Sequence, residues 1–150
     1  MLKQKAVSQK RVHPLTPRRR YTRLRANERR ALEGYLDRLR ARFADHIQRV
    51  ILYGSRARLE GDGESDLDVL VVIDRDDRQL ENEVALAAFE PSLEHGALIS
   101  PLVWSQSHYE LHHRLRLLIY RNIERDGIEL WIDKTRSPSS SIDWRPRKTI

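Results

Sequence analysis

The chain has 150 residues, with 28 Lys or Arg against 22 Asp or Glu, which gives a formal net charge of +6 at pH 7. This length suits one domain, because single hydrophobic cores commonly occupy about 100–200 residues. No apolar run approaches the roughly 18–20 residues of a membrane span, and the lack of cysteine excludes disulfides, thiolate catalysis and cysteine-ligated zinc. We therefore expect a cytoplasmic protein without membrane contact that relies on oxygen and imidazole chemistry, and its hard oxygen ligands favour Mg²⁺.

Positive charge is concentrated at the start of the chain, where nine basic residues up to position 26 meet no acidic residue. Residues 1–26 therefore predict a basic, disordered arm, and residues 134–150, rich in Ser and Pro, predict a disordered tail. The folded domain should occupy residues 27–133. A basic arm attracts polyanions, so nucleic acid is a candidate partner, with a merely solvated tail as the alternative.

The first predicted elements are a helix and a short strand. Asn27 is expected to cap the helix, whose apolar residues recur every three or four positions. These residues are Leu32, Tyr35, Leu36, Leu39, Phe43 and Ile47. Residues 49–53 predict a buried strand that stops at Gly54, and residues 55–59 predict a short helix.

The middle of the chain predicts two further strands with a helix between them. Leu67–Ile73 is apolar except for Asp68, as expected in the centre of a covered sheet. The helix should end near Glu90, because Pro91 cannot continue it comfortably. Residues 97–104 predict a third strand, which the ladder-breaking Pro101 assigns to a sheet edge or a bulge.

The last predicted elements are a helical segment and a short strand. Residues 109–125 should be mostly helical, and Gly127 should cap this segment. Its expected buried residues are Leu111, Leu115, Leu118 and Ile119. Ile128–Ile132 adds a possible final strand, and the whole predicts an α/β (α+β) fold with a small mixed sheet flanked by helices.

Two carboxylates at the start of the second strand form the first candidate site. Asp66 and Asp68 are two residues apart, so strand alternation places both side chains on one face of the sheet. Two like charges this close need a counter-charge, and Mg²⁺ is usually held by one or two carboxylates together with substrate phosphates. The alternative is an ordinary polar turn before a strand.

A Gly-Ser pair after the first strand favours the metal site over the ordinary polar turn. Gly54 lets the backbone come close to a phosphate, and a helix opening at Ser55 would offer unpaired N–H groups. An ordinary turn capped by Ser55 is the alternative. Together, the two features would place triphosphate and Mg²⁺ side by side, without the Gly-Lys-Ser or Gly-Lys-Thr of a P-loop.

The spacing Gly54-Ser55, ten residues, then Asp66-Leu67-Asp68 resembles the signature of minimal nucleotidyltransferases of the DNA polymerase beta superfamily. The resemblance implies attack of an acceptor hydroxyl on the α-phosphate of ATP or another nucleoside triphosphate, with two Mg²⁺ ions and release of pyrophosphate. It makes Asp66 and Asp68 the catalytic metal ligands. Small members of the family work with a helical protein partner, including as antitoxins that attach adenylate to a toxin.

The same resemblance implies nucleotide-binding roles for residues around the motif. Gly54 and Ser55 would hold the β- and γ-phosphates, and Ser65 would orient the carboxylates. Arg56 and Arg58 are candidates for phosphate contacts, since the guanidinium fork suits them. Two residues this close on a helix cannot both point into one site, and a solvated helix face is the alternative.

One departure from the family pattern concerns a third carboxylate, which catalytically complete members carry on the next strand. Residues 96–107 contain no Asp or Glu, and Ser100 and Pro101 stand about where the acid is expected. Glu94 or Glu110 would have to reach in from the ends of that strand. The sequence therefore leaves open a nucleotide-binding or partner-binding module with weakened catalysis, beside the favoured enzyme.

The histidines and tryptophans add little to this hypothesis. His112 and His113 are adjacent and lack zinc spacing to other histidines, so they are expected to be surface or half-buried residues. Trp104, Trp131 and Tyr109 are expected in the core rather than as stacking platforms for bases.

Overall fold

The computed structural model describes residues 24–57 and 65–132. The predicted arm, except residues 24–26, lies outside this part of the chain, as do the predicted tail and Arg58. In chain order the elements are α1 (Ala26–Phe43), β1 (Ile47–Tyr53), β2 (Leu67–Ile73), α2 (Arg78–Leu86), α3 (Phe89–His95), β3 (Ile99–Ser105), α4 (Gln106–Leu115), α5 (Leu118–Asp126) and β4 (Ile128–Ile132). No helix among the described residues is long and apolar enough to cross a membrane.

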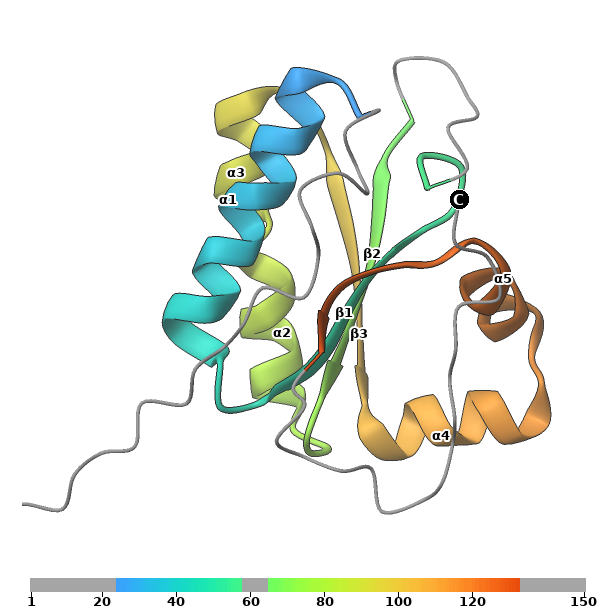
Figure 1. Ribbon diagram of the computed structural model, residues 1–150. Coiled ribbons are helices and arrows are strands. Elements are labelled where there is room, and N and C mark those ends of the chain that lie inside the picture. Colours follow the sequence, from blue (N-terminus) through green and yellow to red (C-terminus); the bar gives the residue numbers. More distant parts are fainter. Residues whose placement is uncertain (1–23, 58–64, 133–150) are drawn as a thin grey trace, which may run out of the picture.

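The four strands form one mixed sheet in the order β3-β2-β1-β4, covered by helices on both faces (Figure 1). β1 pairs antiparallel with β2 and β4, and β2 pairs parallel with β3. Helices α1, α2 and α3 cover one face, while α4 and α5 lie against the other. The predicted small mixed sheet with flanking helices is confirmed, and β3 lies at an edge of the sheet, one of the two placements that its proline predicted.

Alternation along β2 divides the core between these two faces. Val69 and Val71 belong to the larger apolar cluster under α1, whereas Leu70 and Val72 belong to the smaller one under α4 and α5. Because side chains alternate, Asp68 lies on the same face as Leu70. The predicted core aromatics are confirmed as buried: Trp104, Tyr109 and Trp131.

The N-cap of helix α1 lies two residues before the expected N-cap, Asn27. Arg25 is the N-cap, and the Glu28 carboxylate accepts a hydrogen bond from the Arg25 backbone N–H at 2.8 Å. Asn27 instead lies in the first turn, where its side-chain amide donates to the Gly96 carbonyl at 3.3 Å. The helix ends at Phe43, so Ile47 begins β1 rather than extending the helix. Capping by Asn27 was therefore a wrong prediction.

The predicted single helix before Pro91 is two helices. α2 ends at Leu86, and α3 runs from Phe89 through Pro91 to His95. Pro91 is tolerated because it lies in the first turn, where a backbone N–H has no partner within the helix. Its ring packs against α1 at Gly34, where a Cβ atom would lie 3.3 Å from the proline Cβ. The expected helix end at Glu90 was therefore wrong.

The predicted segment 109–125 is also divided, into α4 and α5. Arg116 ends α4 in the left-handed region at φ 50°, a conformation that non-glycine residues seldom adopt. The division turns the leucines outward, because Tyr109, Tyr120 and Ile123 fill the space against the sheet. Three of the four residues expected to be buried are instead exposed: Leu111, Leu115 and Leu118. Gly127 caps α5 and β4 follows, as predicted.

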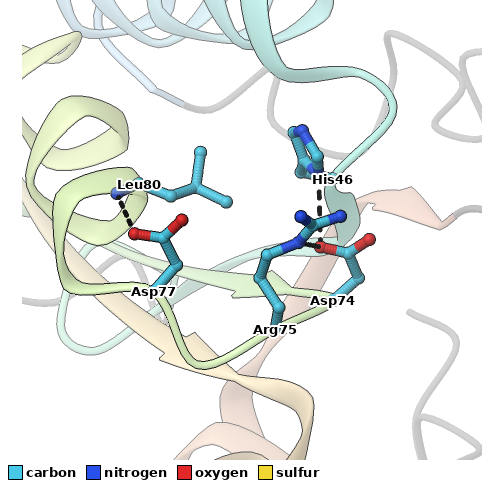
Figure 2. A network of polar contacts seen from close by, with 5 residues as sticks. All are labelled: His46, Asp74, Arg75, Asp77 and Leu80. Atoms are coloured by element: carbon cyan, nitrogen blue, oxygen red, sulfur yellow. Dashed lines mark hydrogen bonds and ion pairs between the residues drawn. The ribbon is translucent and has the colours of Figure 1, made fainter.

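A polar network fixes the chain where β2 leads into α2 (Figure 2). The Asp74 carboxylate accepts from Arg75 Nε at 3.2 Å and lies 3.3 Å from His46 Nδ1. Asp77 caps α2 by accepting the Leu80 backbone N–H at 3.1 Å. These contacts anchor the end of β2 opposite to the predicted motif.

Candidate active site

The two halves of the motif meet at the paired ends of β1 and β2. Tyr53, the last residue of β1, is the register partner of Asp68. Gly54 follows with φ +77°, a conformation that suits glycine. A Cβ atom on residue 54 would clash with the Asp68 Oδ2 atom and lie 3.3 Å from its Cγ. The Asp68 carboxylate therefore rests directly against the glycine backbone.

Asp66 and Asp68 interact electrostatically, as their spacing predicts. Asp66 lies just before β2 and is exposed, whereas Asp68 is half-buried. Burial, and then the negative charge of Asp66, raise the pKa of the Asp68 carboxyl above its usual range. A divalent cation would relieve this repulsion and recover the lost solvation. The chemistry of the pair thus fits Mg²⁺, with Asp66 and Asp68 as the residues that would hold it.

Tyr53 lies beside Asp68 in the site, a position that the motif did not predict. Burial and the charge of Asp68 raise the pKa of the Tyr53 phenol to about 12, so the hydroxyl stays protonated at neutral pH. Since Tyr53 and Asp68 pair across the strands, their side chains share one face. The signal available in the sequence was the position of Tyr53 at the end of a buried strand, directly before Gly54.

Arg56 has a partner outside the motif. Its guanidinium NH2 lies 2.7 Å from the Glu28 carboxylate of α1, and both side chains are buried. This ion pair attaches the turn after Gly54 to the start of α1. The phosphate contact predicted for Arg56 stays a prediction, and one face of this guanidinium is already engaged. Sequence reasoning missed Glu28, although its three-residue spacing from Arg25 is typical of a helix start.

The remaining motif residues are placed only in part. Ser55 is half-buried in a turn over residues 55–57, which replaces the expected helix at these three positions. A helix dipole therefore does not support the predicted phosphate contact of Ser55. Ser65 is half-buried directly before Asp66, where its predicted orienting role stays a prediction.

Strand β3, which pairs with β2, carries a serine where the family pattern has its third acid. Ser100 of β3 is the parallel register partner of Asp68 and is exposed. Glu94 is exposed on α3 near His95, and Glu110 belongs to α4 beyond the far end of β3, where it accepts from Gln106. Within the described residues, no group of three His, Cys, Asp or Glu could hold a metal. The described carboxylate set therefore consists of Asp66 and Asp68.

The fold and this site define a phosphoryl-transfer domain without a P-loop. Its family is the Nucleotidyltransferase domain family, which matches residues 32–130. The chain belongs to this family and is a nucleotidyltransferase of the minimal polymerase beta type, as the resemblance implied.

Two relatives come from Methanocaldococcus jannaschii. "Putative protein adenylyltransferase MJ0604" is 28% identical over 105 residues, covering 70% of this chain and 99% of that protein. "Putative protein adenylyltransferase MJ0141" is 38% identical over 87 residues, covering 57% of this chain and 81% of the relative.

Solved structures of toxin–antitoxin proteins are more distant. A mutant of the toxin–antitoxin MntA–HpeT has a TM-score of 0.46 at 15% identity. A toxin–antitoxin with AMP-PNP has a TM-score of 0.46 at 18% identity. In both cases the match covers 69% of this chain and 75% of the other chain.

Proposed function

We propose that this nucleotidyltransferase moves AMP from ATP to a hydroxyl group of a protein acceptor. In this reaction the acceptor oxygen bonds to the α-phosphorus, the bond from that phosphorus to the bridging oxygen breaks, and pyrophosphate leaves as the hydroxyl proton passes to solvent. Asp66 and Asp68 would hold two Mg²⁺ ions, which when bound stabilise the negative charge of the reacting phosphates.

The observation that carries this proposal is the contact between the Asp68 carboxylate and the Gly54 backbone. It brings the carboxylate that would hold metal close to a backbone that phosphate could approach, although 13 residues separate the two positions. Asp66 adds a second carboxylate at the exposed side. This chain's own residues thus bind and orient the triphosphate, while Tyr53 lines the carboxylates and shields one side from water.

The choice of a protein acceptor and of ATP is supported by the relatives, whose names describe protein adenylyltransferases. The described domain has no second lobe to enclose an acceptor, so the acceptor itself should complete the cleft. A helical partner or a toxin, as the family resemblance implies, stays the expected acceptor. Nucleic-acid binding through the basic arm stays a separate prediction.

The test is transfer of label from α-labelled ATP to a protein in a lysate of the host, with Mg²⁺ and purified full-length chain. Asp66→Ala combined with Asp68→Ala should abolish labelling. The matched control combines Asp37→Ala with Asp45→Ala, which removes two exposed carboxylates and changes the net charge equally. This control should label the acceptor as the wild type does, and mass spectrometry of the labelled band then identifies acceptor and residue.

The exposed Ser100 beside Asp68 favours a second candidate function, a nucleotide-dependent binding module with weakened catalysis. Calorimetry with ATP and Mg²⁺ separates the two. Binding that requires Asp66 and Asp68, without label transfer from any of the four nucleoside triphosphates, would contradict the enzyme proposal and support the module. Labelling lost only in the carboxylate double variant would contradict the module.

A further inference from the structure

A cluster of indole and imidazole rings lies at the other end of the sheet from the active site. His108 and His112 are one helical turn apart on α4, and their Nε2 atoms are 3.0 Å from each other. Helix α4 begins after Ser105, which is five residues beyond Ser100 along β3. At about 3.3 Å per strand residue, this separation is roughly 16 Å, so the two histidines take no part in the nucleotide site.

The centroid separation of the two rings is compatible with their chelating one ion. A ring nitrogen lies roughly 1.1 Å from its ring centre, given C–N bonds of about 1.33 Å. Rings pointing straight at each other across 3.0 Å would therefore have centroids roughly 5.3 Å apart, whereas the observed separation is 4.7 Å. The axes of His108 and His112 therefore do not run end to end. The separation matches axes that converge on one point about 2.0–2.1 Å from each nitrogen, the usual metal–imidazole distance.

The sheet holds both rings in this arrangement. The His112 ring stacks on buried Trp104 with centroids 4.0 Å apart, and the His108 ring lies tilted at 5.3 Å from the same indole. Ser105 caps α4 by accepting the His108 backbone N–H at 3.2 Å. Because Trp104 contacts both rings, part of their side-chain freedom is already lost before a ligand binds.

The chemistry of His112 also suits a ligand. Its Nδ1 atom is buried and has no hydrogen-bond partner among the described residues, so Nε2 is the nitrogen that can reach a ligand.

From this geometry we propose that His108 and His112 form a binding site for one late first-row divalent metal ion, distinct from the nucleotide site. Two nitrogens 3.0 Å apart at about 2.0–2.1 Å from an ion subtend about 91–97° at it. This angle suits the tetragonal or octahedral coordination of Cu²⁺ and Ni²⁺ better than tetrahedral Zn²⁺. Since the described residues add no third His, Cys, Asp or Glu, water completes the coordination shell.

The experiment is calorimetric titration of the full-length chain with Cu²⁺, Ni²⁺ or Zn²⁺ in a non-coordinating buffer without nucleotide. We expect one site of this kind, which binds Ni²⁺ more tightly than Zn²⁺ and Cu²⁺ most tightly. His108→Ala and His112→Ala should each weaken binding by about tenfold or more, that is by about 1.4 kcal/mol or more. His113→Ala is the matched control on the same helix and should leave this binding unchanged.

Two further measurements locate the ion. Cu²⁺ bound beside Trp104 should quench tryptophan fluorescence, and Trp104→Phe should remove most of the quenching while the calorimetric site persists. The combined Asp66→Ala and Asp68→Ala variant should also keep the site. Equal binding by the wild type, His108→Ala and His112→Ala would overturn the proposal, as would loss of the site in the carboxylate variant or tighter binding of Zn²⁺ than of Ni²⁺.

Discussion

Replacing Gly54 by alanine tests the close approach on which the active site depends. The residue has φ +77°, and the added Cβ would clash with Asp68 Oδ2. Two costs follow, one from the backbone conformation and one from displacement of the carboxylate. Gly96→Ala offers a matched control, because Gly96 has φ +61° and a Cβ there would meet nothing within 4 Å.

The two costs can be given magnitudes. A left-handed conformation costs an alanine about 1–2 kcal/mol. For a domain of this size, each kcal/mol of lost stability lowers Tm by roughly 4–8 °C. The Asp68 carboxylate must in addition retreat by roughly 1 Å to an ordinary contact distance. A displacement of that size at a reacting centre can lower the rate by about 100-fold. Gly54→Ala should therefore lose both stability and activity, and Gly96→Ala stability alone.

The assay compares thermal unfolding with the initial rate of labelling from α-labelled ATP at saturating Mg²⁺. Both alanine variants should melt earlier than the wild type, whereas only Gly54→Ala should label the acceptor about 100-fold more slowly. If Gly54→Ala labels as fast as Gly96→Ala, the Asp68 carboxylate does not need its place against residue 54. The active-site assignment made from this contact would then be refuted.

Three further predictions concern buried or half-buried charges. Glu28→Ala leaves the buried Arg56 guanidinium without its carboxylate, so the free energy of unfolding in urea should fall by about 3–5 kcal/mol; a loss below about 1 kcal/mol would contradict this. Glu129→Ala removes both oxygens that the Arg49 fork binds at 2.8 Å and should cost a similar amount, with metal-dependent ATP binding unchanged in calorimetry of the folded variant. Asp68→Asn should raise Tm at pH 7 without divalent metal, because the raised pKa means that ionising Asp68 destabilises the fold. This gain should vanish near pH 3, below the usual Asp pKa of about 3.9, and an equal gain at both pH values would contradict it.

The strands and the motif could be predicted from the sequence because their signals are local. Leu67–Ile73 is a strand with the predicted bounds, since a short apolar run between turn residues is typical of a buried strand. The approach of Gly54 to Asp68 follows from two adjacent strands and an antiparallel register. One residue, Pro101, likewise limited β3 to a sheet edge or a bulge, and β3 lies at an edge.

The errors came from contacts between distant parts of the chain and from breaks within helical segments. Glu28 belongs both to the start of α1 and to the buried pair with Arg56, a combination that periodicity does not reveal. The exposure of Leu118 depends on the break at Arg116, whose left-handed conformation is rare for arginine. Pro91 predicts a helix end, but it lies in the first turn of α3, a place that depends on where that helix begins.

Pairing of Tyr53 with Asp68 has a consequence for how this enzyme can diversify. The ladder between β1 and β2, rather than the connection that joins them, sets the distance between Gly54 and Asp68. Residues inserted into or deleted from that connection would leave both ends in register, because longer loops cost little additional closure entropy. Changes in the length of the connection can therefore accumulate while the approach of Gly54 to Asp68 is kept.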